Sequence, residues 1–116
     1  MAKDDYHVIV YQILSYLYSQ LKKGERIDVN MFSCEALFGI NEMYREYIIL
    51  NLYEAGYIKN VSVNETKYID GTIQTHITGL ENCRITPRGI EYLTDNSFME
   101  KAKEFFKDVK SIVPFI

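Results

Sequence analysis

The sequence predicts an α+β fold in which three helices come before a β-hairpin and two further helices follow it. Apolar residues recur at helical spacing between residues 6 and 21. β-Branched and aromatic residues then crowd residues 57–78, around an Asp70-Gly71 pair that is the strongest hairpin signal in the chain. After residue 97, apolar residues return at helical spacing among charged ones.

The chain of 116 residues has the length of one compact domain and is too short for two ordinary ones. Hydrophobic residues make up 47% of it and aromatic residues 14%, so a core can form without disulfides or metal. The formal net charge of -3 opposes attraction to a phosphate backbone. We therefore expect a single domain, residues 1–116, with little nonspecific affinity for nucleic acid.

The two cysteines, Cys34 and Cys83, have no CxxC spacing and no histidine placed to complete a zinc site. We expect two reduced thiols and no metal. The first twelve residues contain acids and no long apolar run, so they predict neither a signal peptide nor a membrane helix. These features favour a cytoplasmic protein.

The first predicted helix covers about residues 4–23. Its acidic start and its two terminal lysines suit the helix dipole, and Gly24 follows as a stop. Its apolar stripe consists of Tyr6, Val10, Ile13, Leu14, Leu17 and Leu21. Further apolar residues beside the stripe are Val8, Tyr11 and Tyr18. We therefore expect a second covered surface, against either the C-terminal helix or another copy of the chain.

Two more helices are predicted after a short connector. Asn30 can cap a short helix over residues 31–39, and Asn41 can cap a longer one over residues 42–55. Gly39 and Gly56 follow these helices as stops. The core face of the longer helix is predicted to consist of Tyr44, Ile48, Ile49, Leu52 and Ala55.

The hairpin is predicted to turn at Asp70-Gly71 through a type I′ turn. A short strand at residues 83–86 then leads into the segment ITPRGIEYL, residues 85–93. In this segment Thr86 can cap a helix and Pro87 fits its first position, where a missing N–H costs nothing. Gly89 permits close packing against the hairpin.

The last predicted helix begins near residue 97 with a capping box formed by Ser97 and Glu100. Its apolar face consists of Phe98, Ala102, Phe105, Phe106, Val109 and Ile112. The opposite face is charged, so the helix is amphipathic and has to dock on another part of the molecule. We expect the pair of phenylalanines to pack on the first helix.

This order of elements is that of a winged helix: a three-helix helix-turn-helix core, a β-hairpin wing and two C-terminal helices. The stretch NLYEAGYI, residues 51–58, looks like the end of a winged-helix recognition helix, and ITPRGIEYL is similar to the LTxxGxxYL junction after the wing in many bacterial winged-helix proteins. The whole chain resembles the YjcQ-like family of small winged-helix proteins from bacteria and prophages, with residues 64–82 as an enlarged wing. The resemblance implies a DNA-binding, transcriptional or prophage-associated regulator, and it transfers no catalytic residue.

If residues 41–55 form a recognition helix, its first turns would enter a major groove. The candidate contacts to nucleic acid are Asn41, Arg45, Lys59, Lys67 and Arg88. However, this helix carries one Arg against three Glu, a net charge of -2, and carboxylates repel phosphate. For Arg45 we favour an ion pair with a Glu of its own helix over a contact to DNA.

Ten tyrosines in a chain without Trp indicate either an interface or rings folded over the edges of a small core, and both interpretations stay open. The candidate interface residues are Tyr11, Tyr18, Tyr47, Leu50 and Tyr53. The partner would then be a second copy, giving a homodimer, or another protein.

The sequence offers no catalytic residue and no cofactor site that we can name. Neither His7 nor His76 is set beside a nucleophile with a third orienting group, and no glycine loop suited to phosphate is present. We therefore expect a noncatalytic protein without cofactor, metal or membrane partner. Two hypotheses follow: a regulator that binds duplex DNA, or a protein-interaction or dimerisation module that has lost DNA binding.

Overall fold

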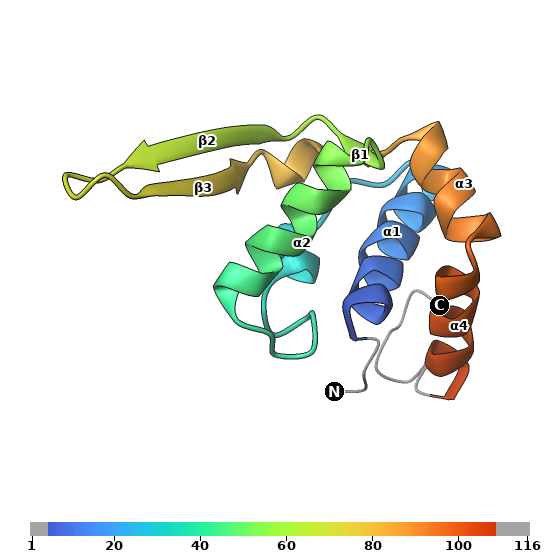
Figure 1. The fold of residues 1–116 in the computed structure, drawn as a ribbon. Helices are drawn as coiled ribbons and strands as arrows, with labels where there is room; N and C mark the ends of the chain where they lie inside the picture. Colours follow the sequence, from blue (N-terminus) through green and yellow to red (C-terminus); the bar gives the residue numbers. More distant parts are fainter. Residues whose placement is uncertain (1–4, 109–116) are drawn as a thin grey trace.

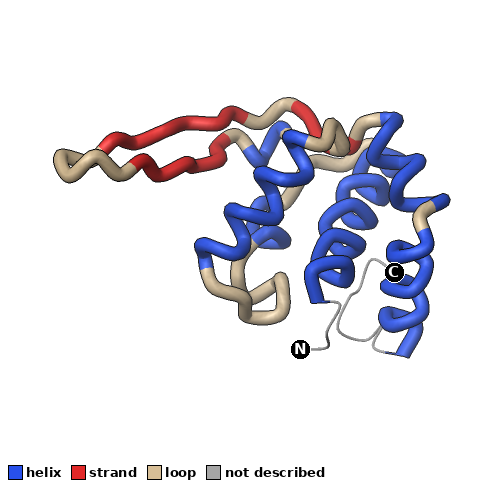
Figure 2. The backbone as a smooth tube through the Cα atoms, in the orientation of Figure 1, coloured by secondary structure: helices blue, strands red, loops and turns tan. Residues whose placement is uncertain are grey.

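The computed structural model describes residues 5–108, and within them it has four α-helices, two 3₁₀-helices and two antiparallel two-stranded sheets (Figures 1 and 2). The α-helices are α1 (Asp5–Lys23), α2 (Glu42–Glu54), α3 (Pro87–Asp95) and α4 (Ser97–Asp108). The strands are β1 (Ile58–Lys59), β2 (Ser62–Lys67), β3 (Ile73–Thr78) and β4 (Arg84–Ile85), and the 3₁₀-helices are η1 (Val29–Phe32) and η2 (Leu80–Asn82). The predicted α+β class is confirmed.

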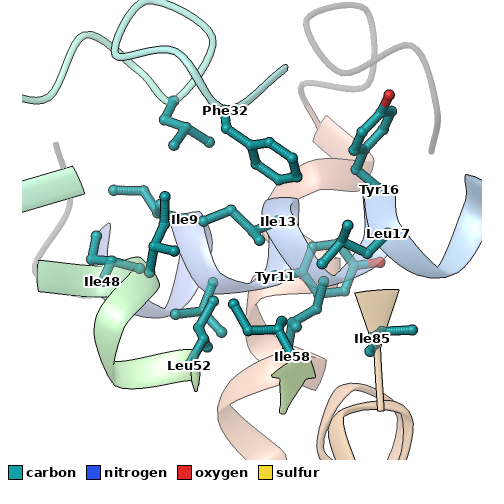
Figure 3. Close-up of a cluster of buried hydrophobic side chains, with 14 of the residues drawn as sticks. Ile9, Tyr11, Ile13, Tyr16, Leu17, Phe32, Ile48, Leu52, Ile58 and Ile85 are labelled. Carbon is teal, nitrogen blue, oxygen red and sulfur yellow. The ribbon is translucent and has the colours of Figure 1, made fainter. Parts of the chain in front are cut away.

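Helix α1 lies at the centre of the core, and the other elements pack around it. Its buried hydrophobic residues are Val8, Ile9, Val10, Tyr11, Ile13, Leu14, Tyr16 and Leu17. Figure 3 shows side chains of α2, β1 and β4, among them Leu52, Ile58 and Ile85, converging on this helix. The predicted stripe is right over most of its length, but Leu21 at its end is 42% exposed.

Helix α4 covers the second surface of α1. Of the two predicted alternatives, the C-terminal helix and another copy of the chain, the structure shows the first. The rings of Tyr11 and Phe106 stack with their centroids 5.3 Å apart. The buried residues of α4 are Met99, Ala102 and Phe106. Phe105, expected to pack on the first helix with Phe106, is partly exposed. Val109 and Ile112, which the prediction placed on the same face, lie outside the described residues.

The start of α4 differs from the predicted capping box by one residue. The side-chain oxygen of Asn96 accepts the N–H of Phe98 at 2.8 Å, and the backbone carbonyl of Asn96 accepts the N–H of Glu100 at 3.0 Å. Asn96 therefore caps the helix, and Ser97 is the first helical residue.

The prediction of a helix over residues 31–39 with Asn30 as its cap is wrong. Asp28 instead caps the 3₁₀-helix η1 by accepting the N–H of Asn30 at 3.0 Å. The chain then runs through turns to residue 39. Ser33 has extended backbone, with φ of -69° and ψ of 159°, which interrupts a helix after Phe32. Phe38 and Gly39, with φ angles of 67° and 72°, are left-handed and end the segment.

The β2–β3 hairpin projects from the helical body as an arm (Figure 1). The predicted hairpin at Asp70-Gly71 is confirmed, but the type I′ turn is wrong, because Asp70 is not among the residues with positive φ. The N–H of Gly71 donates to the carbonyl of Tyr68 at 3.0 Å, and Gly71 follows with φ of 90°. This is the three-residue loop in which a β-turn ends in a left-handed glycine.

Strands β1 and β4 pair at the base of the arm, with Ile58 opposite Ile85. Helix α3 begins directly after β4, where Thr86 accepts the N–H of Gly89 at 3.0 Å as predicted. A Cβ atom on Gly89 would lie 2.8 Å from Cγ1 of Ile85 and even closer to the carbonyl oxygen of Tyr57. The predicted close approach at Gly89 is therefore present, but its partners are Tyr57 and Ile85 at the β1–β4 pair and not the β2–β3 hairpin.

Candidate functional site

A groove of about 670 Å³ runs between α2 and the inner strand of the arm, and we call it the α2–β3 groove. Its α2 wall consists of Glu42, Met43, Glu46, Tyr47 and Leu50. Its arm wall consists of Tyr68, Thr72, Ile73, Gln74, Thr75, His76 and Ile77. Since α2 would be the recognition helix of a winged helix, this groove lies between the two elements expected to contact a partner.

Large apolar side chains in the α2–β3 groove are exposed to solvent. Met43 is 81% exposed, Tyr47 is 57% exposed and Ile73 is 56% exposed. Leu50 also lines the groove and is half-buried against the core. A contiguous apolar surface of this kind marks an interaction site more often than scattered single residues do.

The charge of the α2–β3 groove is negative. Glu42 and Glu46 are its charged lining residues, and no Lys or Arg contributes to either wall. A polyanion such as duplex DNA would meet the exposed Glu42 carboxylate here without a Lys or Arg in the lining to balance it, whereas a basic and apolar ligand would fit this wall.

Glu46 fixes the arm on α2. Its Oε2 atom accepts the backbone N–H of Ile77 at 3.2 Å, and its Oε1 atom lies 3.5 Å from Nη1 of Arg45. Nε of Arg45 also donates to the carbonyl of Phe32, in η1. Both side chains are largely shielded from solvent. The ion pair favoured for Arg45 is therefore present, and the Arg45 side chain is committed to contacts within the chain.

A model of the YjcQ protein family matches residues 11–112. The chain belongs to the YjcQ family. Comparisons of the chain with curated proteins and with solved structures find no match. The matched range includes α2 and the whole arm, so this YjcQ family member carries its α2–β3 groove inside the family region.

The predicted nucleic-acid contacts do not form one cluster in this YjcQ family member. Asn41 accepts the N–H of Tyr44 at 2.8 Å as the cap of α2. Lys59 lies in β1 at the base of the arm and Lys67 at the far end of β2, and both are exposed. Arg88 is exposed on α3, with its guanidinium carbon 5.9 Å from the ring centroid of Tyr57.

The predicted interface residues divide between groove, surface and core. Tyr47 and Leu50 line the α2–β3 groove, and Tyr53 is exposed further along α2. Tyr18 is half-buried, with Nζ of Lys22 4.3 Å from its ring centroid. The ring of Tyr11 is only 8% exposed and stacks on Phe106 of α4, so it is mainly part of the core.

Sequence reasoning missed Met43, Tyr68 and Ile73 as candidate interface residues. Met43, Tyr47 and Leu50 follow one another at helical spacing on α2, which is the pattern of a second apolar stripe. That signal could have identified the α2 wall of the YjcQ groove. The arm residues gave no such signal, because a strand sequence does not say which edge will face a helix.

The two thiols of the YjcQ chain are not paired with each other. Burial raises the pKa of the Cys83 thiol to about 12, whereas Cys34 is only half-buried. Among residues 5–108, no group of three or more His, Cys, Asp or Glu side chains is placed to hold a metal ion. Within the same residues, no helix combines the length and the apolar composition that crossing a bilayer requires.

Proposed function

We propose that this YjcQ family member is a noncatalytic winged-helix protein that binds another protein through its α2–β3 groove. The element order supports the winged-helix assignment: α1, a turn region with η1, α2, the arm as wing, then β4, α3 and α4. α2 takes the place of the recognition helix in this arrangement, and the arm lies beside it (Figure 1).

The observation that carries the protein-binding proposal is the combination of exposed apolar side chains and negative charge in the α2–β3 groove. Met43, Tyr47 and Ile73 offer apolar surface that a protein partner would bury. The exposed carboxylate of Glu42 would repel the phosphates of DNA at the same place. A protein ligand satisfies both features, and duplex DNA satisfies neither.

The test is to select binders of the folded chain from a display library of random twelve-residue peptides. We expect enriched peptides whose binding falls at least tenfold in the Tyr47→Ser variant. The matched control is Leu21→Ser, since Leu21 is also an exposed apolar helical residue but lies outside this groove. Circular dichroism establishes that both variants fold. No enrichment, or equal binding to both variants, would overturn the proposal.

Duplex DNA is the second candidate ligand, favoured by the basic residues at the base of the arm. Lys59 lies opposite Arg84 in the β1–β4 pair, and Arg88 is exposed on α3. A DNA-binding regulator, prophage-borne or not, would use these residues on the phosphate backbone. Binding to mixed duplex DNA over a salt series tests this role, because phosphate contacts weaken steeply as salt rises. A Lys59→Glu variant should reduce such binding, and absence of binding at low salt excludes a nonspecific DNA role.

A further inference from the structure

We propose that the α2–β3 groove takes its partner as an extended, basic peptide segment that pairs with the edge of β3 as a third strand. This inference rests on the proposed protein-binding function and adds the conformation and the charge of the ligand. Strand addition of this kind draws affinity from backbone hydrogen bonds and specificity from the pockets for alternate side chains.

The hydrogen-bond alternation of the hairpin identifies the outward-facing backbone groups. The N–H of Tyr68 donates to the carbonyl of Thr72 at 2.9 Å, so these two residues form a hydrogen-bonded pair. Hydrogen-bonded and non-bonded pairs alternate along an antiparallel ladder. The β3 residues of the non-bonded pairs are therefore Ile73, Thr75 and Ile77. Their N–H and C=O groups point away from β2.

An independent contact supports this assignment. The N–H of Ile77 donates to the Glu46 carboxylate on α2, which requires that it points away from β2. Glu46 thus occupies one end of the β3 edge. Within residues 5–108, the N–H groups of Ile73 and Thr75 donate no hydrogen bond to another element. Two positions of the edge remain open to a ligand.

The β3 edge, and not one face of the hairpin, forms the arm wall of the groove. Five consecutive residues, 73–77, line the groove, although their side chains alternate between the two faces of the hairpin. No residue of β2 lines it. Consecutive residues of a strand line a groove together when the groove runs along the hydrogen-bonding edge of that strand. A ligand lying along it would span about five residues, roughly 16 Å at the rise of a strand.

The charges select the ligand. The exposed carboxylate of Glu42 favours a segment that carries Lys or Arg, and the exposed ring of Tyr47 offers apolar contact to alternate side chains. The hairpin of a second copy fits less well. Residues 62–78 hold one lysine, Lys67, against two acids, Glu65 and Asp70, so the hairpin would bring net negative charge to an acidic groove. We therefore assign the groove to a foreign basic segment.

The experiment uses the peptides enriched by the library selection, each synthesised with free backbone amides and with alternate amides N-methylated. N-methylation leaves the side chains in place but removes strand pairing. On the protein, Thr75→Pro removes the outward N–H without removing a bond to β2, and proline is tolerated at such edge positions. Thr75→Val keeps the N–H and is the matched control.

We expect the enriched peptides to carry Lys or Arg among alternating apolar residues. N-methylation and Thr75→Pro should each weaken binding at least tenfold, and Thr75→Val less than threefold. Amide exchange at residues 73 and 75 should slow when peptide is bound. Should Thr75→Pro fail to fold, the N-methylated peptides still decide the question.

Three results would overturn this inference while leaving the proposed function intact: unchanged binding after N-methylation, enriched peptides that are acidic, or peptides that bind as helices. Concentration-dependent dimerisation that Thr75→Pro abolishes would assign the edge to a second copy, which also overturns it. A selection without enriched peptides refutes the proposed function itself, so the two failures are distinguishable.

Discussion

The close approach at Gly89 makes a Gly89→Ala variant a sharp test of how α3 is seated. In an open helix position this substitution would stabilise by about 1 kcal/mol, because alanine has the higher helix propensity. Here the new methyl group would lie 2.8 Å from Cγ1 of Ile85 and closer still to the carbonyl oxygen of Tyr57. Ordinary carbon contacts are about 3.5–4 Å, so the neighbours have to move.

The cost is high because one of these neighbours is backbone. The Tyr57 carbonyl accepts the N–H of Thr86 at 3.0 Å, and displacing it would weaken that hydrogen bond by about 1 kcal/mol. Overpacking adds about 1–3 kcal/mol. Allowing for the propensity gain, we expect Gly89→Ala to reduce the free energy of unfolding by about 1–3 kcal/mol. The sign is opposite to that of an ordinary glycine-to-alanine change in a helix.

Urea unfolding followed by far-ultraviolet circular dichroism measures this change as a lower midpoint at an unchanged slope. Glu91→Ala is the matched control, since Glu91 is exposed in the same helix and its replacement should change stability by less than about 0.5 kcal/mol. A Gly89→Ala variant as stable as the parent, or more stable, would show that helix propensity dominates and that α3 does not contact Tyr57 as described.

Three further predictions concern the arm and the thiols. Glu46→Ala removes the acceptor of a β3 amide, so we expect a loss of about 1–2 kcal/mol and faster hydrogen exchange of that amide by NMR. The buried Cys83 thiol, with its pKa raised to about 12, should react with a thiol reagent at pH 8 only when the chain unfolds, whereas Cys34 should react first, and mass spectrometry of timed samples checks the order. Hydrogen bonds from the backbone and the hydroxyl of Thr72 hold the pKa of Asp70 below its ordinary value of 3.8. Because the folded pKa is the lower one, the loop should be stabilised above pH 3.8 and loosen as the pH falls through the folded pKa; an NMR titration in which Asp70 protonates at or above 3.8 would contradict this.

The elements that the sequence predicted correctly are those with local signals. Asn41 and Thr86 cap the predicted helices because a cap needs only the residues of the first turn. The hairpin at residue 71 follows in the same way from the conformational freedom of glycine. The prediction for residues 31–39 failed because their composition suits a helix, while the structure interrupts the segment at Ser33, whose backbone is extended.

The candidate site was predictable only in part. Tyr47 and Leu50 stood out because they lie off the core stripe of their helix, and both line the groove. Tyr11 stood out for the same reason and is buried, because a central helix is covered on more than one side. Sequence periodicity separates a core stripe from the rest of a helix, but it does not say whether the remaining surface meets solvent or another element.

The sequence by itself determined the α+β class, most element positions, the family resemblance and the negative charge of α2. The tertiary structure decided which edge of the arm faces α2, that Arg45 is committed within the chain, and that Met43 and Ile73 share one groove. The physical reason is range. Caps, turns and periodicity act over a few neighbouring residues, whereas the groove depends on contacts such as that of Glu46 with Ile77, which are 31 positions apart and form only when the chain folds.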